Sequence, residues 1–170
     1  MDRRQSRTTR TAVALGAAAL LVALGSPQAA AGEVVRAKGS FSPSGPAWTY
    51  DGVVPSGATA AVHAVEIPSR GTIATLHVRG FPASTEFMVH AHTGGCGSDP
   101  AASQGHYQDQ VGGPVDDVNE LWLGFTTTRA GTGFAKAAVD WHFREGEANS
   151  LTFHDPSRNG KRVACLPVAF

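Results

Sequence analysis

The sequence has little charge and few cysteines, and helical periodicity is nearly absent over most of its length. Only 16% of its 170 residues are charged, with fourteen basic and fourteen acidic residues in balance. No dense group of Lys and Arg stands out beyond the first ten residues, which argues against a nucleic-acid-binding protein, because such proteins carry a basic patch. No internal repeat or low-complexity tract is visible, which argues against a repeat protein.

The one long apolar run lies near the N-terminus, in the pattern of a secretory signal peptide. Four arginines within residues 3–10 precede an apolar segment at 12–24, and a small-residue site follows at 29–31. This run is too short and wrongly flanked for a membrane span. We predict a signal peptide at residues 1–31 and one domain at residues 32–170, in a protein that is secreted or held at the cell envelope. The Arg3-Arg4 pair leaves the choice between general and twin-arginine export open.

Removing residues 1–31 leaves ten basic and thirteen acidic residues, together with both cysteines, Cys96 and Cys165. An even pair of cysteines in an exported chain indicates one disulfide. Closing a loop of about 70 residues would contribute roughly 4 kcal/mol in the chain-entropy model.

Beyond the N-terminal run, the sequence consists of short runs with period two, separated by Gly, Pro, Ser and Asp. Alternate residues of a strand face opposite sides of a sheet, so such runs predict half-buried strands. The runs cover residues 34–41, 48–54 (a weak one), 59–67, 72–78, 86–92, 121–127, 134–143, 151–154 and 162–168. About eight short strands predict an all-β fold, an eight-stranded antiparallel Greek-key barrel or sandwich. Residues 93–119 form a long loop, a feature that is usually functional.

Histidines are distributed unevenly along these runs. His90 and His92 lie two apart in the run at 86–92, so they share one face of the predicted strand. His106 lies in the long loop, and His154 points outward from a later strand. A His-x-His pair with single histidines from elsewhere suits metals that prefer imidazole, copper and zinc foremost. On spacing alone, two unrelated surface histidines are the alternative. The others are expected at the surface: His63, His77 and His142.

In the order and neighbours of these residues, the chain resembles the copper/zinc superoxide dismutase family over nearly all of residues 32–170. The His90-x-His92 pair is similar to the family's first two copper ligands, and His106 in Gly-His-Tyr is similar to its bridging histidine. His154 is similar to the last copper ligand. The family's loop cysteine and its Arg-x-Ala-Cys segment are matched by Gly94-Gly95-Cys96 and by residues 162–165. The resemblance implies a Cys96–Cys165 disulfide, and it implies catalytic roles for Arg162 and His106.

The chain departs from the family at the zinc subsite. No histidine lies between His106 and Trp122, and Val111 stands where the family usually has one. Zinc is therefore not expected, because carboxylates alone replace imidazole poorly. This trimming resembles the copper-only branch, in which a carboxylate orients the bridging-type histidine. Glu120 is the best match for that carboxylate and Asp109 the second.

The resemblance implies a copper-dependent superoxide dismutase with one copper per chain, and superoxide as its small-molecule partner. Arg162 would attract the anion, and His106 would carry a proton. The alternatives without a functional role are a surface cation at a strand end for Arg162 and a solvated acid for Glu120. An exported copper-binding or copper-delivery protein with little turnover is the alternative function, and a plain interaction module ranks third. Monomer and homodimer both stay open.

Overall fold

A computed structural model describes residues 32–170, so the predicted signal peptide lies outside the described residues. In this range the chain forms nine strands and two short 3-10 helices. The strands are β1 (Glu33–Ser40), β2 (Trp48–Thr49), β3 (Thr59–Ile67), β4 (Gly71–Arg79), β5 (Glu86–His92), β6 (Phe125–Thr126), β7 (Gly133–Val139), β8 (Ser150–Asp155) and β9 (Lys161–Pro167). The 3-10 helices are η1 (Pro100–Ser103) and η2 (Pro156–Arg158). Among residues 32–170, no helix is long and apolar enough to cross a membrane.

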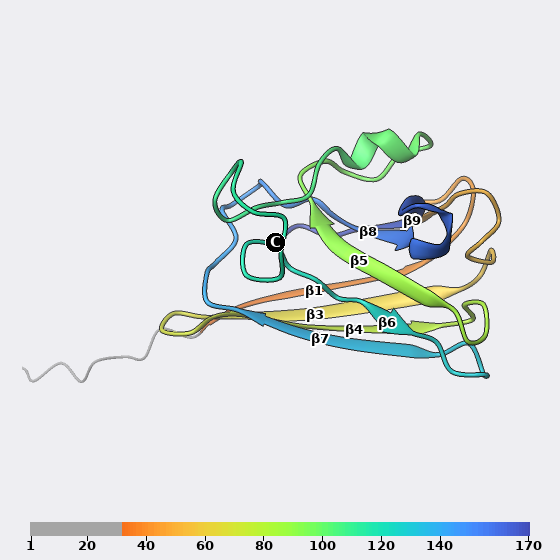
Figure 1. Cartoon of the computed structure of the whole chain (residues 1–170), viewed down its shortest axis with the longest axis horizontal. Coiled ribbons are helices and arrows are strands. Elements are labelled where there is room, and N and C mark those ends of the chain that lie inside the picture. Colours follow the sequence, from red (N-terminus) through yellow and green to blue (C-terminus); the bar gives the residue numbers. More distant parts are fainter. Residues whose placement is uncertain (1–31) are drawn as a thin grey trace, which may run out of the picture.

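The strands form two antiparallel sheets that lie as two layers (Figure 1). One sheet has the order β1-β3-β4-β7, and the other has the order β2-β9-β8-β5-β6. The prediction of an all-β antiparallel sandwich is confirmed, with nine strands in place of eight. The barrel alternative is wrong, because within residues 32–170 the two sheets remain separate hydrogen-bonded ladders. The Greek-key connection stays a prediction.

Two predicted strands are shorter than the period-two pattern indicates. In the run at 121–127, Leu121 and Leu123 are fully buried, yet only β6 forms a regular ladder with β5. The run at 134–143 likewise leaves its ladder at Val139, although Trp141 remains buried. Alternating polarity reports which side chains are buried, whereas a strand also needs a continuous hydrogen-bonding partner.

The core lies between the sheets and follows the alternation of the strands. Phe87, Val89 and Ala91 of β5 are buried on the core face, as the sequence predicts. Phe153 of β8 lies at the centre, fully buried. Its ring contacts three other aromatic rings with centroids 5.4–6.5 Å away, those of Phe41, Phe81 and Phe125. This aromatic cluster joins β6 and β8 to the segments before β2 and after β4.

The predicted disulfide is confirmed. Cys96 and Cys165 are bonded, with Cα atoms 5.6 Å apart and a separation of 69 positions in sequence. Cys165 belongs to β9, and Cys96 lies in the long loop that leaves β5. The bond therefore ties this loop to the five-stranded sheet.

The long loop at 93–119 is more ordered than its composition suggests. It contains η1, whose N-cap Asp99 accepts a hydrogen bond from the Ala101 backbone N–H at 2.8 Å. Gly94 lies so close to this turn that a Cβ there would come within 2.2 Å of the Ala102 carbonyl oxygen. The loop therefore folds back over β5, and Figure 1 shows η1 above that strand.

We expect Phe153→Ala to lower the free energy of unfolding by about 3–5 kcal/mol, because it leaves a cavity amid the aromatic cluster. Phe134→Ala is the matched control, since Phe134 is 54% exposed, and we expect it to change stability by less than about 0.5 kcal/mol. Urea unfolding followed by fluorescence measures both. Equal losses in the two variants would contradict the assignment of the core.

Candidate metal centre

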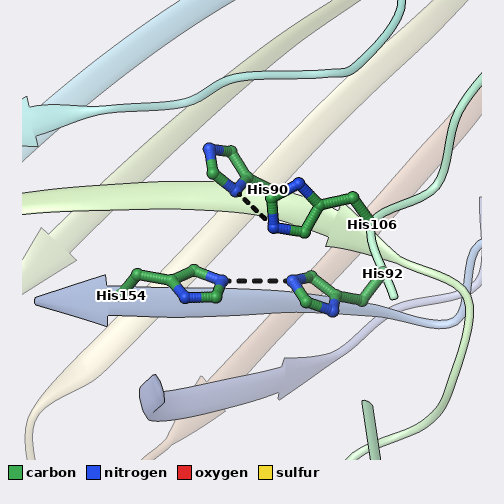
Figure 2. A group of neighbouring side chains, drawn as sticks. All are labelled: His90, His92, His106 and His154. Carbon is green, nitrogen blue, oxygen red and sulfur yellow. Dashed lines mark hydrogen bonds between the residues drawn. The ribbon is translucent and has the colours of Figure 1, made fainter. Parts of the chain in front are cut away.

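Four histidines come together on the face of β5 that points away from the core. His90 and His92 project from β5, His154 from the neighbouring strand β8, and His106 from the long loop (Figure 2). One ring nitrogen from each lies within 4.8 Å of the corresponding nitrogens of the others. The structure thus brings together all four histidines that the sequence singles out, and the cluster can hold a metal ion.

Strand register and one loop bridge explain this convergence. Met88 pairs with His154 across β5 and β8, and paired residues of an antiparallel ladder share a face. His154 therefore lies on the same side as His90 and His92, which are two and four residues after Met88. His106 reaches the site because it forms an isolated antiparallel bridge with His92. The Tyr107 backbone N–H also donates to the Ala91 carbonyl at 2.8 Å.

The outward face of β5 is not open to solvent. His90 is 5% exposed, His92 is fully buried and His154 is 8% exposed. The covering loop accounts for this burial, which period-two spacing within one strand does not predict. His106 is the exception, with 26% of its side chain exposed. A small molecule from solvent therefore meets the cluster at His106.

Backbone carbonyls set the tautomers of two of the histidines. His92 Nδ1 lies 3.1 Å from the Gln104 carbonyl oxygen, and His154 Nδ1 lies 2.8 Å from the Gly160 carbonyl oxygen. A carbonyl only accepts, so each Nδ1 carries the proton and each Nε2 keeps a lone pair. Gly160 sits in the tight turn after η2 at φ 69°, a conformation that favours glycine.

The two Nε2 atoms of His92 and His154 are only 3.1 Å apart (Figure 2). Neither carries a proton in the tautomers described above, so two lone pairs face one another. Such a contact is favourable only when a cation lies between the nitrogens. The donor set therefore fits a metal ion on the evidence of its own hydrogen bonds.

A buried carboxylate orients the third histidine. His106 Nδ1 lies 2.7 Å from Glu120 Oε2, and the Glu120 side chain is only 1% exposed. Trp122 Nε1 donates to the same oxygen at 3.0 Å, and Gln108 Nε2 donates to Oε1 at 3.0 Å. With Nδ1 engaged by Glu120, His106 turns its Nε2 toward the cluster, 3.0 Å from His90 Nδ1. Metal-binding histidines commonly have such an acceptor on their second nitrogen.

Of the two acids considered for this position, Glu120 lies beside His106 and Asp109 contacts other groups. The Asp109 carboxylate is 4.0 Å from the Arg144 guanidinium, and its backbone N–H donates to the Asn119 carbonyl. Trp122 and Gln108 were not anticipated from the sequence. Trp122 could have been found, because it lies two residues after Glu120 in a predicted strand and so shares its face.

Arg162 lies directly opposite His154 in the β8–β9 ladder. Its guanidinium donates to the Pro100 carbonyl at 2.9 Å, to Ser103 Oγ at 3.2 Å and to the Gln104 carbonyl. The Gln104 carbonyl thus receives hydrogen bonds from both Arg162 and His92. Arg162 therefore fixes the carbonyl that orients a histidine of the cluster, three residues before the disulfide at Cys165.

Burial keeps three of the clustered imidazoles neutral, those of His90, His92 and His154. It is the main reason why the pKa of His90 and that of His92 fall from 6.5 to about 3, and the neighbouring imidazoles add to the effect. Burial also lowers the pKa of His154. At neutral pH these rings therefore offer lone pairs to a cation. His90 Nε2 is buried without a hydrogen-bond partner among residues 32–170.

The other three histidines lie away from the cluster. His63 and His77 are on the outer face of the four-stranded sheet, and His142 Nδ1 is 3.5 Å from a Glu66 carboxylate oxygen. Among the described residues, none of the three belongs to the group that can hold a metal.

No protein-family model matches this chain, and no curated protein matches it either. Any function assigned to the protein therefore depends on its own residues and on their arrangement.

We expect the metal-free protein to lose stability as the pH falls from about 6.5 toward 3. The unfolded chain binds protons at His90 and His92 below 6.5, whereas the folded chain binds them only near 3. The unfolded state is therefore favoured by up to about 1.4 kcal/mol per pH unit for each of these histidines. Urea unfolding at a series of pH values, with a chelator present, measures the slope.

A pair of variants isolates this contribution from that of the carboxylates. His90→Gln should flatten the slope in this pH range, whereas the exposed His77→Gln should leave it unchanged. Identical slopes in the wild-type protein and in His90→Gln would contradict the burial of a neutral His90.

Proposed function

We propose that this protein is an exported copper-dependent superoxide dismutase, related to the copper/zinc superoxide dismutases that its sequence resembles. The observation that supports this best is the convergence of four imidazole nitrogens, three of them on rings whose orientation is set from outside the cluster. Carbonyls of Gln104 and Gly160 and the carboxylate of Glu120 hold the outer nitrogens of three rings. These acceptors leave the inner nitrogens with lone pairs aimed at a common centre.

Copper fits this donor set better than zinc. Imidazole ligands accept either metal, but the affinity of a given nitrogen site is higher for Cu²⁺ than for Zn²⁺ in the Irving–Williams order. In the related family a second metal would use His106 Nδ1, and here that nitrogen is engaged by Glu120. We therefore propose one copper per chain, held by His90, His92, His106 and His154, without zinc.

Bound copper would supply the one-electron couple Cu(II)/Cu(I), which would accept an electron from one superoxide and pass it to a second. The overall reaction consumes two superoxide anions and two protons and yields dioxygen and hydrogen peroxide. The protein's part is to admit a small anion and to deliver protons. Entry is possible at His106, the only partly exposed member of the cluster.

Arg162 supplies positive charge beside the cluster. It lies opposite His154, and burial first and the Arg162 charge to a smaller extent lower the pKa of His154 and that of His92. The field of this charge would draw in superoxide, and guanidinium N–H groups bind small anions well. The disulfide at Cys165 and the carbonyls of the η1 segment hold Arg162 in place.

His106 is the natural proton carrier. Its Nδ1 keeps its proton because Glu120 accepts the hydrogen bond from Nδ1–H, so Nε2 would be the atom that takes up and releases a proton whenever it is not holding copper. Trp122 and Gln108 hold the carboxylate in position for this role. Partial exposure of His106 gives solvent protons a route to Nε2.

An exported copper-binding or copper-delivery protein with little turnover is the second candidate. It stays an alternative because ligands that hold copper do not by themselves imply turnover. Only η2 and a tight turn separate His154 from Arg162, where the related family carries a long charged segment, and this trimming resembles the copper-only branch of that family. Export itself is supported by the apolar N-terminal run and by the disulfide, which is typical of proteins in oxidising compartments.

Copper-loaded protein should consume superoxide, and His154→Ala should remove nearly all of this activity because one ligand is lost. His142→Ala, which removes an exposed histidine outside the cluster, should retain it. Arg162→Gln should lower kcat/KM, and the difference from wild type should shrink at high salt, because salt screens electrostatic attraction. Pulse radiolysis or stopped-flow detection of superoxide measures all four proteins.

Two results separate the candidate functions. Tight copper binding with no faster consumption than in His154→Ala would favour the copper-delivery protein. Failure to bind copper at all would remove both candidates.

Copper affinity should fall when the Glu120 network is weakened. Glu120→Gln removes the charge that holds the His106 proton, and Trp122→Phe removes one donor to Glu120 while keeping a ring near His90. Replacing groups that orient metal ligands typically costs about 10–100-fold in metal affinity or activity. We expect Glu120→Gln to reach this range and Trp122→Phe to fall at its lower end, in competition titrations with a chelator.

Trp141→Phe is the matched control, because the Trp141 indole N–H donates to the Val118 carbonyl and not to the Glu120 network. An equal loss of copper affinity in Trp141→Phe and Trp122→Phe would show that the indole of Trp122 has no specific role.

A further inference from the structure

The outer face of the four-stranded sheet carries a concentration of positive charge. Directly paired residues of antiparallel strands share one face of the sheet. Two neighbouring rows therefore cross the outer face from β1 to β7: Arg36, His63, Thr75 and Lys136 in one, and Lys38, Ala61, His77 and Phe134 in the other. Arg79 lies two residues after His77 on β4 and so joins this face. We call these residues the basic face.

The charge on the basic face is of one sign. Its four cations are Arg36, Lys38, Arg79 and Lys136, and the four strands place no acidic residue on this side. Glu33 of β1 and Glu66 of β3 have the opposite alternation, that of the core-facing residues. Within residues 32–170, none of the four cations forms an ion pair. Because acids outnumber bases in residues 32–170, this clustering runs against the overall charge.

A shallow groove follows the centre of the basic face. Two adjoining hollows share Lys38, Ala61 and His77, and they extend to Arg36 at one end and Arg79 at the other. The small side chain of Ala61 on the central strand β3 leaves this space. A further hollow continues past His77 and is lined by hydroxyl side chains of Thr126, Thr128 and Thr132 and by Phe134. The groove thus offers cations, hydroxyls and one aromatic ring in sequence.

We propose that the basic face binds an acidic polysaccharide along this groove. The cations would pair with carboxylate or sulfate groups, and the threonine hydroxyls would bond to sugar hydroxyls. The ring of Phe134 is 54% exposed and lies 4.7 Å from the His77 ring. Its electron-rich face offers a surface for the polarised C–H groups of a sugar ring.

Nucleic acid is a poorer match for this surface. Reading of a DNA duplex uses a helix or a two-stranded ribbon that enters a groove, whereas the basic face is the broad side of a four-stranded sheet. Proteins that bind single strands combine cations with several aromatic platforms for successive bases. Phe134 is the only Phe, Tyr or Trp that β1, β3, β4 and β7 place on this face. A flexible chain that carries charges and hydroxyls fits better than one that needs stacked bases.

Binding of purified protein to dextran sulfate and to polygalacturonate, measured by calorimetry at several salt concentrations, tests the proposal. The first polymer offers sulfates and the second carboxylates, so the two identify the preferred anionic group. Uncharged dextran and a single-stranded DNA oligonucleotide are the comparison ligands. We expect binding to at least one acidic polysaccharide that weakens with salt, because neutralising a linear polyanion releases counterions.

Charge-matched variants locate the site. Arg36→Gln with Lys38→Gln removes two cations of the basic face, and we expect roughly tenfold weaker binding from the loss of two exposed charge pairs. Arg70→Gln with Arg129→Gln changes the net charge equally, in turns outside the four strands, and should bind like wild type. Phe134→Ala should weaken binding at constant charge. Far-ultraviolet circular dichroism checks that each variant is folded.

Chemical shifts give a second, independent readout. Addition of the better polysaccharide should shift backbone amides of β1, β3 and β4 and leave those of β8 and β9 unchanged. The proposal is overturned if the control pair loses as much affinity as the basic-face pair, or if neutral dextran binds equally well. It is also overturned if the DNA oligonucleotide binds more tightly than both acidic polymers, which would point to a nucleic-acid partner. None of these outcomes depends on copper or on superoxide.

Discussion

The Gln104 carbonyl oxygen holds the candidate metal centre together. It accepts from His92 Nδ1 on β5 and from the Arg162 guanidinium on β9, so one atom joins a strand, a loop and a second strand. Gln104 has φ 57°, a backbone conformation that side-chain-bearing residues rarely adopt and that costs roughly 1–3 kcal/mol. Such a conformation persists when its surroundings demand it, and here two donors and the nearby disulfide do so.

Much of the fold could be predicted because the alternation of apolar and polar residues along a strand can be read directly from the sequence. The period-two spacing of Phe87, Val89 and Ala91 is enough to predict that they are buried. The closure of the sandwich and the ends of the strands could not be read in this way, because a ladder depends on a partner distant in sequence. The burial of His92 could not be predicted for the same reason, because the segment that covers it lies outside its own strand.

The candidate site shows the same division. The four histidines were found from their spacing and from a family resemblance, whereas the groups that orient them are largely backbone carbonyls. The sequence does not indicate that the carbonyls of Gln104 and Gly160 have this role, because every residue has a backbone carbonyl. The basic face was missed as well. Arg36, Lys38, Arg79 and Lys136 are scattered through the chain, and only the register of four strands gathers them.

The two sheets pack against one another through the core, and their outer faces carry different kinds of side chain. The histidine cluster lies on the outer side of the five-stranded sheet, and the cations lie on the outer side of the other. A molecule attached to a surface through its cationic layer would therefore keep the histidine layer toward the surrounding liquid. Attachment through the cations would not block access of small molecules to the histidines, because the core separates the two faces.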